Sequence, residues 1–217
     1  MHGGFMSNLK RIKPITRSQE EAFEAWKQGG HLILDGWAGT GKTFIASYLG
    51  FSPPKSKVTY VRSCVPTRDI GHLPGTYEEK TAIYELPYIQ IAAELFKDPK
   101  AYERLKDDKQ VEFLTTSYMR GITLKDSVII VDEAQNLTID EIDTIITRMG
   151  DGARIIFCGD TYQCDFNVAG KKKEMSGFEE LIYTAKDMGE FTRIRFKQED
   201  IVRSDIVKTW IIRRHGK

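Results

Sequence analysis

The sequence has no long run of apolar residues. None of its segments approaches the roughly 20 consecutive apolar residues that a helix needs to cross a bilayer. Residues 1–13 also lack the apolar core of a signal peptide. We therefore expect no membrane segment and a cytoplasmic location.

Cysteine is scarce. The three that occur, Cys64, Cys158 and Cys164, show no CxxC spacing. An odd number of dispersed cysteines predicts neither a disulfide framework nor a zinc site. Cys158 ends an apolar run, so we expect it to be a small buried hydrophobic residue.

The chain also lacks an excess of charge of either sign. The chain carries 32 Lys and Arg against 31 Asp and Glu, a formal net charge of +1. Such a balance gives the whole molecule no strong attraction to nucleic acid. Binding of that kind would need a local patch, for which the candidates are the lysine run at 171–173 and the basic cluster at 213–217.

Repeats, low-complexity segments and proline-rich linkers are absent as well. With 41% hydrophobic and 29% charged residues, the composition is typical of a globular protein. We expect one domain over residues 1–217, with residues 1–14 as a flexible N-terminal arm.

Along the chain, segments typical of strands alternate with segments typical of helices. Ser18 and Glu21 fit a capping box at the start of the first helix. Alternation of buried strands with helices predicts an α/β fold, with a mostly parallel central sheet covered by helices on both faces. The expected strands are 31–35, 57–61, 111–115, 127–131, 154–158 and 191–196; the expected helices are 17–28, 42–49, 139–148 and 178–187, with a helical section over 77–106.

A glycine-rich segment follows the first strand and opens the next helix. It fits the pattern GxxxxGK followed by Ser or Thr, whose backbone N–H groups and helix N-terminus cradle phosphates. Lys42 would reach the β- and γ-phosphates, and the Thr43 hydroxyl would bind Mg²⁺. The residues predicted to contact the nucleotide here are Gly36, Ala38, Gly39, Thr40, Gly41, Lys42 and Thr43.

Two adjacent carboxylates end the apolar strand at 127–131. Asp132 would hold the Mg²⁺ shell, and Glu133 would act as the general base that activates the attacking water. A third polar loop follows the strand at 154–158, and from it Gln163 could touch the γ-phosphate or that water. Alone, each of these two patterns is common; the phosphate-binding segment gives them weight.

Taken together, these motifs resemble those of superfamily 1 helicases and, more closely, of the PhoH-like family of ATPases. The likeness extends from Ile15 to Trp210, nearly the full chain. The stretches that carry it are 36–43, 73–75, 119–124, 132–136, 159–163, 176–178 and 200–203.

This resemblance implies a three-layer RecA-like P-loop NTPase fold, binding and hydrolysis of ATP with Mg²⁺, and a role on RNA or single-stranded nucleic acid. It implies that Gln19 is similar to the glutamine that reads adenine in many helicases. Arg62 matches an arginine for which a nucleic-acid or phosphate contact is plausible, although the Ser63-Cys64-Val65 run after it departs from the family pattern.

A single core leaves the source of an arginine finger open. The lengths before and after the motifs leave no room for a second RecA-like core, so the arginine would come from a neighbouring subunit or hydrolysis would be slow. We therefore expect a homo-oligomeric ring, a hexamer by the family resemblance. Arg203 is the leading candidate for the finger, ahead of Arg193 and Arg195.

Two other functions fit the same motifs. A small-molecule kinase would need a lid with arginines, and residues 77–109 are long enough for a lid but contain only Arg104. A nucleotide-gated scaffold would bind ATP without hydrolysing it. The base candidate Glu133 favours a hydrolase over both, whereas no motif identifies helicase activity.

Overall fold

The computed structural model describes residues 8–52, 57–63, 77–119, 121–163 and 176–215. Several features of the sequence lie outside these ranges: Cys64, Cys164, the lysine run at 171–173 and the Leu-Pro-Gly segment at 73–75.

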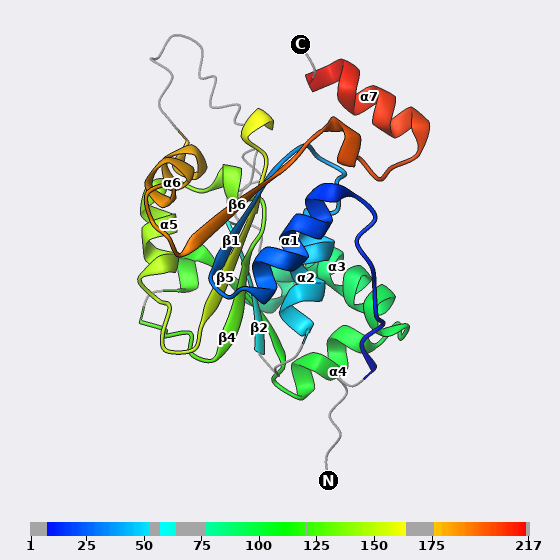
Figure 1. The fold of residues 1–217 in the computed structure, drawn as a ribbon. Coiled ribbons are helices and arrows are strands. Elements are labelled where there is room, and N and C mark those ends of the chain that lie inside the picture. Colours follow the sequence, from blue (N-terminus) through cyan, green and yellow to red (C-terminus); the bar gives the residue numbers. More distant parts are fainter. Residues whose placement is uncertain (1–7, 53–56, 64–76, 120, 164–175, 216–217) are drawn as a thin grey trace.

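A six-stranded sheet forms the centre of the molecule (Figure 1). All five pairings between neighbouring strands are parallel. The strand order is β3-β2-β4-β5-β1-β6. The bounds are β1 His31–Gly36, β2 Lys57–Arg62, β3 Val111–Thr115, β4 Ser127–Val131, β5 Arg154–Gly159 and β6 Phe191–Phe196. The predicted parallel sheet and RecA-like fold are thereby confirmed.

Helices cover both faces of this sheet. Helices α1 to α4 pack on one face and α5 and α6 on the other, while α7 projects beyond the carboxyl-terminal edge (Figure 1). The bounds are α1 Arg17–Lys27, α2 Lys42–Phe51, α3 Tyr77–Phe96, α4 Ala101–Asp107, α5 Ile139–Ile146, α6 Gly177–Ala185 and α7 Asp205–His215. No helix in the described ranges is long and apolar enough to cross a membrane.

Alternation along the strands produces two separate cores. In β4, Ile130 faces the α1 to α4 side and Ile129 faces the α5 and α6 side, and both are fully buried. A strand that is apolar on both faces can be accommodated only between two helical layers. Cys158 belongs to the first core as a buried free thiol, as expected.

The start of the chain differs from the prediction in two respects. The N-cap of α1 is Thr16, whose hydroxyl accepts from the Gln19 backbone N–H, so the capping box assigned to Ser18 was wrong. Ser18 lies inside the helix, and its hydroxyl donates instead to the Asp200 carboxylate at 2.8 Å. Within the arm predicted over 1–14, residues 8–14 do not extend freely, because Leu9 and Ile12 pack against the core.

Strand order decides which loops meet. Strand β5 lies between β1 and β4, and all three point in the same direction. The segments that follow them, which begin at Trp37, Asp132 and Asp160, therefore leave the sheet side by side at its carboxyl-terminal edge. This edge is where parallel α/β sheets bind their ligands.

Close contact between α6 and the turn before α5 suggests a test of the packing. A Cβ added to Gly177 would lie 2.5 Å from the backbone of Thr138 and Ile139. Backbone atoms cannot rotate away, so Gly177→Ala should lower the free energy of unfolding by roughly 1 to 3 kcal/mol. Gly189→Ala is the control, because nothing lies within 4 Å of the added carbon. Equal urea midpoints for the two variants would contradict the packing.

Candidate active site

The glycine-rich loop between β1 and α2 has the backbone that its sequence predicts. Gly39 and Gly41 adopt φ angles of 77° and 82°, in the left-handed region that glycine tolerates without strain. Gly41 is also the N-cap of α2, where no side chain caps the helix. The first N–H groups of α2 are therefore available to an anion, and the helix dipole favours one there.

Lys42 lies inside this loop. Its Nζ donates to the carbonyl oxygens of Gly36 at 2.6 Å and Trp37 at 2.8 Å. Burial lowers the pKa of the Lys42 ammonium, while the nearby charge of Asp160 opposes that shift. A desolvated ammonium held among carbonyl oxygens interacts strongly with any anion that enters the loop.

Thr43 joins the loop to the acidic strand end. Its hydroxyl donates to Asp132 Oδ1 at 2.7 Å, and Asp132 Oδ2 accepts from the Tyr88 hydroxyl of α3 at 3.0 Å. Burial raises the pKa of Asp132, with Glu133 adding to the shift and Thr43 opposing it. A hydroxyl and a buried carboxylate in contact are oxygen donors of the kind that Mg²⁺ uses beside phosphates.

Glu133 has an unusual backbone. Its φ of 53° and ψ of 42° are left-handed, which a non-glycine residue adopts at a cost of about 1 to 3 kcal/mol. Its Oε2 accepts from Gln135 Nε2 at 2.6 Å, and the other end of that amide, Oε1, accepts from the Asp160 backbone N–H at 3.1 Å. Gln135 thus connects the loop after β4 to the loop after β5.

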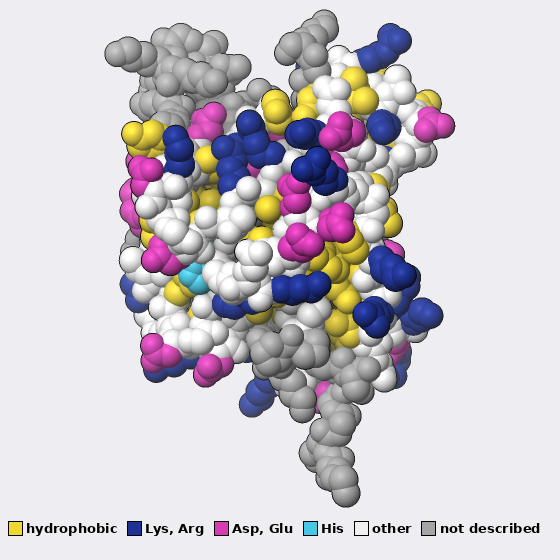
Figure 2. Space-filling view, viewed as in Figure 1, with side chains coloured by type: hydrophobic (Ala, Val, Ile, Leu, Met, Phe, Trp, Pro, Cys, Tyr) yellow, Lys and Arg dark blue, Asp and Glu magenta, His cyan; other side chains and the backbone are white. Residues whose placement is uncertain are grey.

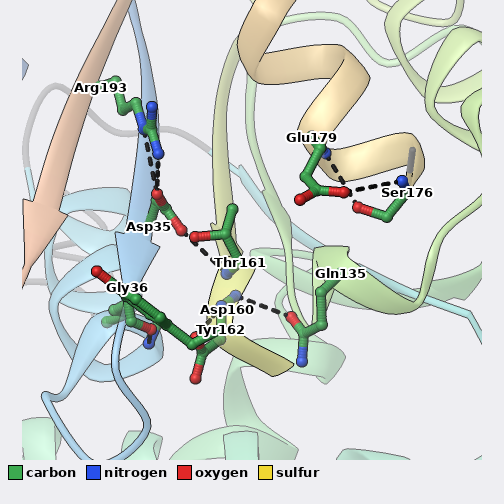
Figure 3. A network of polar contacts seen from close by, with 10 residues as sticks. Asp35, Gly36, Gln135, Asp160, Thr161, Tyr162, Ser176, Glu179 and Arg193 are labelled. Atoms are coloured by element: carbon green, nitrogen blue, oxygen red, sulfur yellow. Dashed lines mark hydrogen bonds and ion pairs between the residues drawn. The ribbon is translucent and has the colours of Figure 1, made fainter. Parts of the chain in front are cut away.

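A further buried carboxylate continues this network (Figure 3). Asp35, at the end of β1, accepts from the Thr161 backbone N–H at 3.1 Å and pairs with the Arg193 guanidinium of β6. Its side chain is 1% exposed. Arg193 therefore neutralises a buried charge of its own chain, and this engagement does not fit the role of finger for a neighbouring subunit.

One cleft collects most of the predicted site residues. Its volume is about 980 Å³, and it extends from residues 10–15 across the loop to the ends of β4 and β5. The predicted residues among those that line it are Gln19, Ala38, Gly39, Gly41, Lys42, Thr43, Arg62, Asp132, Glu133 and Arg203. Thr40 is fully buried beneath the loop. Gln163 lies in the short helix Thr161–Gln163 beside the cleft, and its side chain lies outside the described part of the structure.

Gln19 approaches the loop from α1. Its Oε1 accepts from the Ile15 backbone N–H at 3.0 Å, and its Nε2 donates to the Thr40 carbonyl at 3.4 Å. The side chain is nearly fully buried. Gln19 therefore links the segment before α1 to the phosphate-binding loop.

Arg203 lies on the loop of its own chain. The Val202 backbone N–H donates to the Gly39 carbonyl at 3.0 Å, which holds the tail after β6 across the loop. A Cβ added to Gly39 would lie 3.0 Å from Arg203 Cγ. This placement favours a role for Arg203 in the cleft of its own chain.

The site includes residues that the sequence did not single out by role: Tyr88, Asp35 and Gln135. Gln135 belongs to the run at 132–136 that carries the family resemblance, so that run was a signal for it. Tyr88 and Asp35 gave none, because a tyrosine within a helix and an acid at a strand end are common. In the described ranges, no three His, Cys, Asp or Glu side chains converge on a metal position. A bound Mg²⁺ would thus take its remaining ligands from phosphate and water.

Surface charge is mixed on the face of the molecule that Figure 2 shows. Figure 2 shows basic and acidic side chains interspersed over this face of the described residues. This distribution agrees with the nearly balanced composition.

Sequence comparison identifies a family. The profile described as PhoH-like protein matches residues 11–214. A PhoH-like protein of Bacillus subtilis (strain 168) is 32% identical over 203 residues, covering 91% of this chain and 62% of that protein. Protein PhoH of Escherichia coli (strain K12) is 31% identical over 210 residues, covering 93% and 58%. The chain thus spans about three fifths of the length of these two relatives.

Structure comparison supports the fold. The large terminase of a thermophilic bacteriophage superposes with a TM-score of 0.54 at 14% identity, over 93% of this chain and 50% of the terminase. The complex of that terminase with ADP gives a TM-score of 0.53 at 15% identity, over 92% and 50%. At these identities the likeness concerns the fold alone.

The Asp35–Arg193 pair predicts an effect on stability. Arg193→Ala would leave a buried carboxylate without its cation, which should lower the free energy of unfolding by roughly 1 to 3 kcal/mol. Arg195→Ala is the matched control on the same strand, because the Arg195 side chain forms no ion pair within the described ranges. Urea denaturation of both variants tests this; equal losses would contradict a specific role for the pair.

Proposed function

The chain belongs to the PhoH-like family, and from this membership and the geometry of the cleft we propose that it binds Mg·ATP and hydrolyses it. The observation that carries the proposal is the contact between Thr43 and Asp132. This 2.7 Å hydrogen bond brings the phosphate-binding loop to the acidic strand end, with Lys42 and Glu133 lining the same cleft.

Phosphate binding would use the loop and the start of α2. The N–H groups that follow Gly41 have no side-chain cap, so they can donate to β- and γ-phosphate oxygens. Lys42 would exchange its contacts with the Gly36 and Trp37 carbonyls for those oxygens. Thr43 and Asp132 would hold Mg²⁺, which neutralises phosphate charge and orients the γ-phosphate.

Glu133 would accept the proton of the attacking water. The neighbouring Asp132 is engaged by Thr43 and Tyr88 on its two oxygens, which leaves Glu133 as the carboxylate at this strand end that can take the proton. The amide of Gln135 holds Oε2 of Glu133, which leaves Oε1 for the water. A positioned carboxylate base contributes typically 10² to 10⁴ in rate.

The opposite end of the cleft would hold the nucleoside. Residues 10–15 and the Pro87 to Glu94 part of α3 line that end. Because the Gln19 amide joins Ile15 to Thr40, we propose that Gln19 orients this wall beside the adenine, in agreement with the family resemblance.

The proposal extends to nucleic-acid binding and to the assembly of several chains. We propose that hydrolysis is coupled to binding or remodelling of RNA or single-stranded nucleic acid, in a hexameric ring located in the cytoplasm. The likeness to the PhoH-like family supports these points. Helicase activity would require directional movement in addition.

The first prediction concerns the base. Glu133→Gln should abolish phosphate release from Mg·ATP, reducing it by about 10² to 10⁴, while affinity for ATP remains. Glu24→Gln is the matched control, because this exposed carboxylate of α1 lies outside the cleft and the same charge is removed. Lys42→Ala should weaken ATP binding itself. Phosphate release should be measured with and without single-stranded RNA or DNA.

Two results would reject hydrolysis, and a third would reject only the role of Glu133. Tight ATP binding with no phosphate release by the unmodified protein would leave the nucleotide-gated scaffold. Undiminished release by Glu133→Gln would assign the base to another residue. Transfer of the γ-phosphate to an added metabolite, with no free phosphate, would indicate a kinase.

The second prediction concerns Arg203. Arg203→Ala and Lys42→Ala should each lose hydrolysis, and a mixture of the two should recover none, because each chain supplies both residues to its own cleft. Recovery in the mixture would show instead that Arg203 acts on a neighbouring subunit, as the sequence first suggested. Light scattering of the same samples would give the number of subunits.

A further inference from the structure

Tyr88 occupies a position that neither the motifs nor the family likeness assigns. It lies in the middle of α3, is fully buried, and its hydroxyl donates to Asp132 Oδ2 at 3.0 Å. The other oxygen, Oδ1, accepts from Thr43. Two donors from different elements therefore fix the rotation of this carboxylate.

A second tyrosine supports the first. The rings of Tyr60 and Tyr88 stack with centroids 4.0 Å apart and planes 14° from parallel. The Tyr60 hydroxyl donates to Ser47 Oγ at 2.9 Å, and the Ser47 hydroxyl donates to the Thr43 carbonyl at 2.7 Å. The stacked pair thus reaches Asp132 directly and the backbone of Thr43 through Ser47.

The local structure of α3 increases the importance of the contact between Tyr88 and Asp132 for holding this part of the helix in place. Pro87 directly precedes Tyr88, and a proline inside a helix removes one backbone hydrogen bond. The turn that carries Tyr88 is therefore held less firmly by its own helix. Pro87 also lines the cleft, so this turn faces the proposed nucleotide site.

We propose that Tyr88 is a positioning residue for the magnesium ion: its hydroxyl orients Asp132 and thereby connects α3 to the metal site. The inference rests on the proposed Mg·ATP site. Hydrogen bonds to a metal-binding carboxylate commonly set metal affinity. A shift of α3 would move the donor away from Asp132, so metal binding and the position of α3 are linked.

The opposing explanation is that Tyr88 only satisfies a buried carboxylate. Both explanations predict a loss of stability when the hydroxyl is removed, since a buried acceptor loses its partner. Only the positioning role predicts that the affinity for nucleotide becomes less sensitive to magnesium.

The experiment compares Tyr88→Phe with Tyr84→Phe. Both changes remove a hydroxyl and keep the ring, and Tyr84 lies one turn earlier on α3. The affinity for a fluorescent ADP analogue is measured in excess Mg²⁺ and in excess EDTA. For Tyr88→Phe, affinity in EDTA should match that of the unmodified protein, while the gain on adding Mg²⁺ should fall about tenfold. Tyr84→Phe should keep the full gain.

The outcomes separate the two proposals. No gain from Mg²⁺ in the unmodified protein would overturn the metal site itself. A gain that Tyr88→Phe preserves would leave the metal site intact and overturn the role of Tyr88.

A measurement on the unmodified protein covers the case in which Tyr88→Phe does not fold. Hydrogen exchange in α3 should slow when Mg²⁺ is added to the ADP-bound protein, because the metal fixes Asp132 and Asp132 fixes Tyr88. Unchanged exchange around Tyr88, with slower exchange at the start of α2, would overturn the link.

Discussion

The hydrogen bond between Thr43 and Asp132 is the contact on which the site depends. The two residues follow β1 and β4, which are not neighbours, because β5 lies between them. Helix α2 must therefore begin over the end of β5 to bring its second residue to the acidic strand. Lys42 lies in the same loop, close to the charge of Asp160, and the cleft lies at the same edge of the sheet. The fold thus brings Thr43 and Asp132 together by strand order rather than by proximity in sequence.

A series of polar contacts also connects the loops at the carboxyl-terminal edge of the sheet. From Glu133 they pass through Gln135 to the backbone of Asp160, and from Thr161 through Asp35 to Arg193. This path runs from β4 to β5, β1 and β6, and Figure 3 shows its part from Gln135 to Arg193. Each step has at least one buried partner, namely Gln135 or Asp35, so these contacts hold the loops at the carboxyl-terminal edge to one another.

The sequence predicted the candidate phosphate- and metal-binding residues better than the contacts that hold them in place. Gly36 to Thr43, Asp132 and Glu133 could be singled out as candidates because phosphate and metal chemistry restrict both residue type and spacing. The strands were found because their apolar runs are short and end at polar turns. Tyr88 and the Asp35–Arg193 pair could not be found this way, since their partners lie 44 and 158 residues away. Such contacts follow from strand order, which local patterns do not encode.

At Glu133 the conformational preference of the backbone conflicts with the side chain that the proposed reaction needs. A left-handed conformation favours glycine, and a glutamate adopts it here at a cost of about 1 to 3 kcal/mol. The surroundings offset this cost, because the Glu133 carbonyl accepts from the Asn136 N–H at 2.9 Å and its carboxylate accepts from Gln135. Glycine would relieve the strain and remove the base. The residue that best suits the backbone is therefore unsuitable for the proposed reaction. Because Lys97, Lys109 and Asp126 adopt a similar φ away from the cleft, the strain at Glu133 supports a function only together with its position in the cleft.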